Sequence, residues 1–212
     1  MISIVKKRLD DYLEFNSDLL FKDTDFLEIF GGSIRDAISG LEIHDIDILC
    51  MKNSAIKASE ILESFGYKNV TDKLSMKNIQ QMYKDTHIVF EPWTFMNNNL
   101  KIIQLIRPVS DMKFNNFNMN YHTKQFFDIM KQVDMSCCGV SYDGEGINEN
   151  YPNAINHCRL KFYKINPNAK MYNKDRIFDR KYKLNSRGWT CIDDMTEIEY
   201  NKYIRSAKLN SL

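Results

Sequence analysis

The chain has 212 residues, with 29 basic and 28 acidic side chains and a formal net charge of +1. This balance excludes recognition of nucleic acid through overall charge, so any basic surface for RNA must be local. With 43% hydrophobic and 12% aromatic residues, the chain can bury a substantial core, either as one domain or as one domain with a small appendage.

The cysteines and the N-terminal region indicate the cellular compartment. An odd number of cysteines without a Cys-x-x-Cys pair predicts reduced thiols rather than a disulfide framework. His157 and Cys158 lack a second close pair of ligands, which argues against zinc. The N-terminal region has no apolar signal core, and the chain has no apolar run of about 18 residues. We therefore expect a cytoplasmic protein. The five cysteines are Cys50, Cys137, Cys138, Cys158 and Cys191.

A glycine pair marks the first junction between elements. Residues 2–21 place apolar side chains at helical spacing and predict an amphipathic helix, and residues 26–30 predict a short buried strand. Gly31 and Gly32 end this strand, and Ser33 is expected to be the N-cap of a helix of about two turns that ends before Gly40. The free N–H groups at such a helix N-terminus attract phosphate.

Two aspartates follow on the next strand. Residues 43–49 predict a buried strand in which Asp45 and Asp47, two positions apart, point to the same face. Two carboxylates on one face repel each other, and a divalent cation supplies the missing positive charge. Magnesium suits hard oxygen ligands and substrate phosphates. Two ions held about 3.5–4 Å apart can activate an attacking hydroxyl and stabilise a leaving pyrophosphate.

The rest of the chain predicts alternating helices and strands. Helical spacing predicts helices at 55–65, 76–84, 123–130, 172–188 and 195–203, the first with Ser54 as its N-cap and Gly66 as its stop. Runs rich in β-branched and aromatic residues predict strands at 67–70, 86–95, 101–107 and 133–142. Asn97–Asn99 is expected to form a hairpin turn, and residues 111–121 a polar loop.

The segment Gly31-Gly32-Ser33-Ile34-Arg35-Asp36, followed by Asp45-Ile46-Asp47-Ile48, resembles the head domain of the DNA polymerase β-type nucleotidyltransferase superfamily. It is most similar to bacterial-type CCA-adding tRNA nucleotidyltransferases and poly(A) polymerases. The resemblance implies an α+β fold, in which helices flank a mixed sheet. We predict a head domain at 1–150 and a partly helical extension packed on it at 151–212. The chain is too short for the long helical neck, body and tail of such enzymes.

The same resemblance implies roles for individual residues. Asp45, Asp47 and Asp134 would form the catalytic cluster that holds two Mg²⁺ ions. Asp134 opens a segment that resembles the family stretch Arg-Arg-Asp-Phe-Thr, although Lys131-Gln132-Val133 replaces the residues before it. An ordinary aspartate at a strand edge is the alternative, and Glu91 is the rival third carboxylate.

The turn would bind the nucleotide. Gly31, Gly32, Ser33 and Arg35 are expected to contact the phosphates, although a buried Arg35–Asp36 pair that fixes the turn is an alternative for the arginine.

Basic residues recur on the predicted helix near the C-terminus. This arrangement of basic residues on one helix face resembles the neck helix that reads the incoming base in CCA-adding enzymes, although the spacing differs and the family's Glu-Asp-x-x-Arg motif is absent. A solvated charged helix is the alternative. Arg180 and Arg187 are the candidates for contact with a triphosphate or an RNA backbone, since a guanidinium group pairs bidentately with phosphate. Gln104, within an apolar strand, is expected to be a structural amide or to contact a base edge.

These features together predict a magnesium-dependent nucleotidyltransferase. It would transfer a nucleoside monophosphate from a nucleoside triphosphate such as ATP to an acceptor hydroxyl, for example the 3′ end of a tRNA or another RNA. Two alternatives remain open: a toxin- or defence-type transferase that modifies a protein or a small molecule, and a catalytically idle nucleotide-binding module. The repulsive Asp45/Asp47 pair argues against an idle module.

Overall fold

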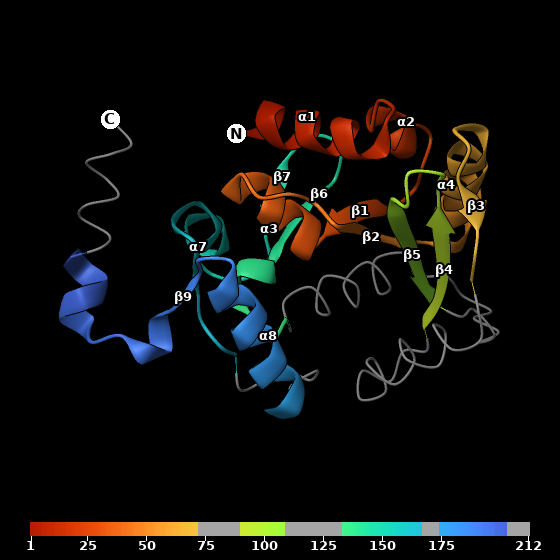
Figure 1. Ribbon diagram of the computed structural model, residues 1–212. Coiled ribbons are helices and arrows are strands. Elements are labelled where there is room, and N and C mark those ends of the chain that lie inside the picture. Colours follow the sequence, from red (N-terminus) through yellow and green to blue (C-terminus); the bar gives the residue numbers. More distant parts are fainter. Residues whose placement is uncertain (72–89, 109–132, 167–173, 203–212) are drawn as a thin grey trace, which may run out of the picture.

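The structure, a computed structural model, describes residues 1–71, 90–108, 133–166 and 174–202 (Figure 1). The helices expected at 76–84 and 123–130, the polar loop at 111–121 and the first part of the strand expected at 86–95 lie outside these residues.

A seven-stranded mixed sheet forms the centre of the molecule, in the order β3-β4-β5-β2-β1-β6-β7. Strands β2 and β5 pair in parallel, whereas the other neighbouring strands in this sheet pair antiparallel. The hairpin expected at Asn97–Asn99 is confirmed, because it joins the antiparallel strands β4 and β5. The strands are β1 Leu27–Phe30, β2 Asp45–Cys50, β3 Lys68–Asn69, β4 Phe90–Met96, β5 Ile102–Pro108, β6 Val140–Tyr142 and β7 Ile147–Glu149.

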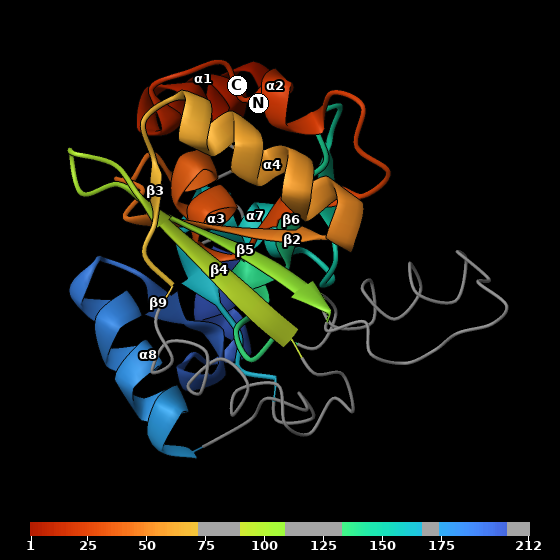
Figure 2. The same ribbon diagram turned by 90° about the vertical axis from the view of Figure 1, so that its right-hand side faces the viewer.

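Helices lie on both sides of this sheet, which confirms the α+β fold class. Figures 1 and 2 show α1 and α4 on one side of the sheet and α8 on the other. The helices are α1 Ile2–Leu13, α2 Asp18–Phe21, α3 Gly32–Ser39, α4 Lys52–Ser64, α7 Ala154–Leu160 and α8 Lys174–Ser186. There are also two short 3-10 helices, η2 Ser136–Cys138 and η3 Ile192–Asp194, and a parallel pair of two-residue strands, β8 Phe162–Tyr163 and β9 Thr190–Cys191. Residues 197–202 are helical as well, within the helix expected at 195–203.

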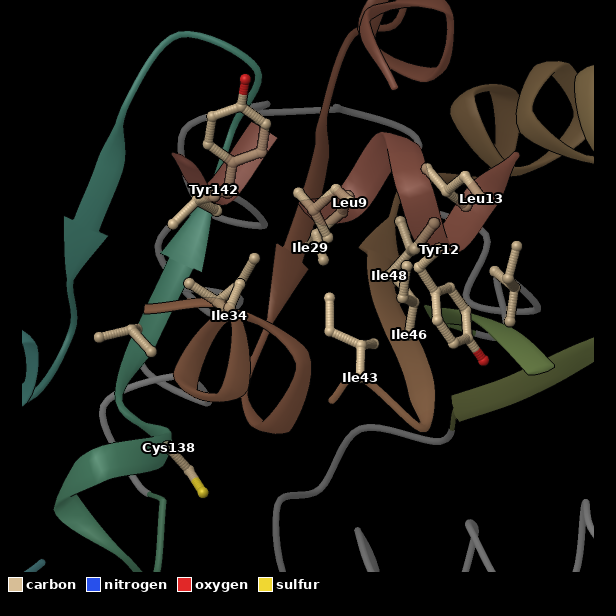
Figure 3. Packing of buried hydrophobic residues seen from close by; sticks show 14 of the residues in the cluster. Leu9, Tyr12, Leu13, Ile29, Ile34, Ile43, Ile46, Ile48, Cys138 and Tyr142 are labelled. Atoms are coloured by element: carbon tan, nitrogen blue, oxygen red, sulfur yellow. The ribbon is translucent and has the colours of Figure 1, made fainter. Parts of the chain in front are cut away.

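The main core lies between α1 and the sheet. Leu9 of α1 and Ile29, Ile46 and Ile48 of the sheet are fully buried and point toward one another (Figure 3). Because side chains alternate along a strand, the residues between these isoleucines face the opposite side of the sheet. Residues beyond position 150 belong to the same core, among them Ala154, Cys158, Ile177, Leu184 and Trp189.

Two predicted helix N-caps lie inside their helices. Helix α3 begins at Gly32, and its N-cap is Gly31, whose φ of 74° and ψ of −127° favour a glycine. Ser33 is in the first turn and donates its hydroxyl to the Phe30 carbonyl at 3.3 Å. Ser54 likewise lies within α4, where its hydroxyl accepts the Phe26 N–H at 3.2 Å. The predicted stop at Gly40 is confirmed, with a left-handed φ of 73°.

The strand predicted at 133–142 is wrong over most of its length. Helix η2 interrupts it, and only Val140–Tyr142 pairs as a strand. Tertiary contacts explain the difference: Ser136 donates its N–H to the Lys164 carbonyl at 2.9 Å, and its hydroxyl lies 2.7 Å from His157 Nδ1. These bonds hold the segment outside the sheet despite its β-branched and aromatic residues.

Gly139, between η2 and β6, is expected to tolerate no larger side chain. A Cβ atom there would lie 2.3 Å from the Tyr151 Cβ, so Gly139→Ala is expected to lower the free energy of unfolding by about 1–3 kcal/mol. Gly146→Ala is the matched control, because a Cβ at Gly146 meets no atom within 4 Å. Urea denaturation of both variants measures the difference, and equal stabilities would contradict the close packing.

Candidate functional site

The glycine turn and the aspartate pair lie side by side on adjacent strands. Phe30, the last residue of β1, pairs directly with Asp47 of β2, and Gly31 follows immediately. Gly31 donates its N–H to the Val140 carbonyl at 3.0 Å, which fixes the turn against β6. The first turn of α3 therefore starts next to Asp47, and its N–H groups have no acceptor in the preceding helical turn.

Asp45 and Asp47 face away from the main core. Ile46 and Ile48 point toward α1, so the two aspartates project from the opposite side of the sheet, where α8 lies (Figures 1 and 3). Asp45 is exposed and Asp47 is partly buried. Gln104 pairs with Asp47 across β2 and β5, so that it lies beside Asp47 on the same face.

The electrostatics of Asp47 indicate a site for positive charge. Burial and then the negative charge of Asp45 raise the pKa of Asp47 to about 7, and the positive charges of Arg180 and Arg176 offset part of this effect. Within the described part of the chain, no three His, Cys, Asp or Glu side chains gather as metal ligands. A pair of carboxylates nevertheless fits magnesium, which in nucleotide sites takes its remaining ligands from phosphate oxygens and water.

Asp47→Asn is expected to stabilise the metal-free protein by about 1–3 kcal/mol at pH 8. The folded-state pKa of about 7 lies above the ordinary value of 3.8, so the folded state binds this proton more tightly than the unfolded state does. Stability therefore falls as the pH rises from about 4 to 7, and Asn, which carries no charge, avoids that loss. Urea denaturation with a chelator should show the gain at pH 8 and not at pH 4. An equal gain at both values would contradict this cause.

Among the described residues, no group of three possible metal ligands contains Asp134 with Asp45 and Asp47, and its role as the third metal ligand stays a prediction. It is fully buried and forms ion pairs with Arg180 and Arg176 of α8, the latter at 3.5 Å between Nε and Oδ2. These two guanidinium groups compensate its charge. Asp134 thus connects the segment before η2 to α8. Arg176 and Arg180 are therefore ion-paired with a buried carboxylate and do not belong to a purely solvated helix face.

The rival carboxylate, Glu91, faces the other side of the sheet. Asp47 shares its face with Gln104 of β5 and Thr94 of β4, and Glu91 lies an odd number of residues from Thr94. Glu91 forms an ion pair with Arg107 instead. It is therefore not positioned to complete a metal site with Asp47.

Arg35 forms the buried pair with Asp36 that was the alternative to phosphate contact. Its Nε and Nη2 donate to the two carboxylate oxygens at 2.8 and 2.9 Å. Arg187, which follows α8, donates to the same carboxylate at 3.1 Å. The predicted phosphate contacts of Arg35 and Arg187 thus compete with this ion-pair network, which connects α3 to the end of α8.

Two groups close to the site were not among the predicted site residues, although Arg176 belongs to the basic stripe that the sequence places on this helix. Arg176 lies one helical turn before Arg180, and this i, i+4 spacing was the signal that both reach the same partner. Cys138 accepts a hydrogen bond from Arg35 Nη1 at 3.4 Å. A hydrogen bond with Cys137 and the charge of Arg35 lower the pKa of the Cys138 thiol. No sequence motif pointed to this thiol.

The fold is similar to that of solved CCA-adding enzymes. No protein-family model matches the sequence, and no curated protein matches it. Solved structures of CCA-adding enzymes are similar to the chain at identities of 12–13%, which shows a shared fold. No helix in the described residues is long and apolar enough to cross a membrane.

Three of these structures illustrate the extent of the similarity. An apo form of a CCA-adding enzyme has a TM-score of 0.58 and 13% identity over 100% of this chain and 46% of its own. A CCA-adding enzyme in complex with CTP gives 0.59 and 12% over 100% and 47%. The Thermotoga maritima CCA-adding enzyme complexed with tRNA gives 0.54 and 13% over 95% and 42%. The chain thus spans less than half the length of these enzymes.

Proposed function

We propose that this protein is a magnesium-dependent nucleotidyltransferase, which transfers a nucleoside monophosphate from a nucleoside triphosphate to an acceptor hydroxyl. One observation carries the proposal: the pairing of Phe30 with Asp47 places a helix-starting glycine turn next to two carboxylates on one face of the sheet. A phosphate-binding backbone and a cation-binding pair are the two components that nucleotidyl transfer requires.

The chain's own residues would bind and orient the reactants. The N–H groups of the first turn of α3, from Gly32 and Ser33, would donate to the β- and γ-phosphates. The Ser33 hydroxyl donates a hydrogen bond to the Phe30 carbonyl. We therefore propose that the backbone N–H of Ser33, rather than its hydroxyl, donates to the phosphates. The acceptor oxygen would form a bond to the α-phosphorus as the bond to pyrophosphate breaks, with no covalent enzyme intermediate.

Asp45 and Asp47 would hold Mg²⁺. When bound, this ion supplies positive charge at the phosphate oxygens and favours deprotonation of the acceptor hydroxyl. The raised pKa of Asp47 supports this assignment, because the cation offsets the repulsion from Asp45. We assign no such role to Asp134, whose carboxylate is paired with two arginines.

Helix α8 lies on the sheet face from which Asp45 and Asp47 project, and it would border the nucleotide site there. Arg176 and Arg180 act electrostatically on Asp47, so their guanidinium groups are near enough to interact with a triphosphate bound there. Arg187 would act as an anchor through Asp36. We propose that residues 151–212 serve as an extension packed on the head, since Ile177, Leu184 and Trp189 belong to the common core.

The acceptor that we propose is the 3′ end of an RNA, such as a tRNA. The similar structures include CCA-adding enzymes in complex with CTP, with ATP and with tRNA, which supports both a nucleotide substrate and an RNA acceptor. The reaction would take place in the cytoplasm.

The test is to incubate the purified protein with each α-³²P nucleoside triphosphate, Mg²⁺ and total RNA. Label on RNA, dependent on Mg²⁺ and absent with γ-³²P nucleotides, is the expected result. Label on protein would instead support a transferase with a protein acceptor. If the protein binds nucleotide but transfers none to RNA, protein or small molecules, it is an idle binding module and the proposal fails.

A further inference from the structure

Helix α8 exposes two aromatic rings to solvent. Phe178 and Tyr182 are 72% and 73% exposed. They are four residues apart and therefore lie on the same face of the helix, one turn from each other. Ile177 and Leu184 of the same helix are buried in the core, so α8 is anchored while the two rings remain uncovered.

Basic residues surround these rings in the sequence of the helix. Lys181 and Lys183 flank Tyr182, and α8 carries five basic and two acidic residues. Arg176 and Arg180 pair with Asp134, and Lys181 pairs with Asp194. Lys183 is exposed beside Tyr182. An anionic partner with flat, stackable groups is complementary to such a surface. Leucine or isoleucine would bind an aliphatic surface of a protein partner as well as aromatic residues do. Unpaired nucleotides, in contrast, stack on aromatic rings and carry negative charge.

Helix α8, which carries the two rings, lies on the side of the sheet where the proposed reaction takes place. Asp45 and Asp47 project from the sheet face opposite α1, and Figures 1 and 2 show α8 on that side. Arg176 and Arg180, from the same helix, act on the charge of Asp47. A strand whose 3′ end reaches these aspartates would therefore pass close to α8.

We propose that Phe178 and Tyr182 form a stacking platform for unpaired nucleotides near the 3′ end of an RNA acceptor. This inference rests on the proposed function, which assumes an RNA acceptor whose 3′ hydroxyl reacts at Asp45 and Asp47. Each ring stacks on one base, and the exposed Lys183 pairs with the backbone. Recognition through stacking tolerates different bases, so the platform selects a single-stranded end rather than a sequence.

The test measures RNA binding without catalysis, by fluorescence anisotropy of an RNA hairpin with a single-stranded 3′ overhang and of the same hairpin with a blunt end. The double variant Phe178→Leu/Tyr182→Leu keeps apolar side chains but removes both rings. It is expected to weaken overhang binding by about 10- to 100-fold and to leave the melting temperature unchanged, since both rings are exposed. Phe178→Trp/Tyr182→Trp should retain binding. Ile198→Ala, at another exposed apolar residue (82%), is the control.

Binding and transfer are scored separately. Unchanged overhang affinity in the leucine variant, or equal wild-type affinity for overhang and blunt RNA, would overturn the platform even if the wild type transfers nucleotides. If the wild type transfers no nucleotide but the rings govern overhang binding, the proposed function fails while the stacking surface stands.

Discussion

Asp45→Asn and Asp47→Asn are each expected to lower nucleotidyl transfer by about 10²- to 10⁴-fold, because charge stabilisation by a bound metal contributes several kcal/mol and each 1.36 kcal/mol is a factor of ten in rate. The two carboxylates project from one face of β2, and Asp47 adjoins the glycine turn through its pairing with Phe30. Asn keeps the shape of the side chain but removes its charge. Single-turnover rates at saturating Mg²⁺ measure the loss.

Two carboxylate controls make this result specific. Asp11→Asn changes an exposed aspartate on α1 and is expected to leave transfer unchanged. Glu91→Gln removes the rival carboxylate, which lies on the other face of the sheet, and is also expected to retain transfer if the protein stays folded. Wild-type rates in both Asp45→Asn and Asp47→Asn would exclude the assignment. If Glu91→Gln lowered the transfer rate as much as Asp47→Asn does, a carboxylate on the other face of the sheet would also be required, which would contradict the proposed site.

The centre of the candidate site could be predicted from sequence because it is local. Gly31, Gly32, Asp45 and Asp47 lie within 17 residues, and their structures follow from short-range rules: glycine at a positive φ, alternation along a strand, and a helix after the turn. Even the error of two residues at the N-cap is of this local kind. Gly31 satisfies a backbone conformation that Ser33 would adopt only with strain, so the helix starts earlier.

The partners of the site could not be predicted in the same way, because they depend on contacts between distant segments. Asp134 and Arg180 are separated by 46 residues, and the strand expected around Asp134 would have placed it at a sheet edge. Hydrogen bonds of the Ser136 hydroxyl, one with His157 Nδ1 and one accepted from the Lys164 N–H, override that local preference. The face that Glu91 occupies follows from the register of β4 on β5, which a pattern of apolar residues does not specify.

Arg176→Ala/Arg180→Ala is expected to destabilise the protein by about 3–5 kcal/mol, because it leaves the buried carboxylate of Asp134 without a compensating charge. Asp134→Asn alone should cost less, about 1–2 kcal/mol, since both arginines are partly exposed and can turn toward water. Adding Asp134→Asn to the double arginine variant should therefore recover part of the lost stability, and urea denaturation measures this non-additivity.

The same set of variants distinguishes an ion-pair role for Asp134 from a metal-ligand role. If Asp134 held Mg²⁺, Asp134→Asn would raise the Mg²⁺ concentration needed for half-maximal transfer as strongly as Asp47→Asn does, and removal of the arginines would leave that concentration unchanged. The ion pairs predict the opposite pattern. Asp134→Asn and the arginine variant should raise the KM for the nucleotide with the Mg²⁺ requirement preserved, because the buried carboxylate orients Arg176 and Arg180, whose charges act on Asp47. Additive stability losses would show that Asp134 and the arginines are not coupled.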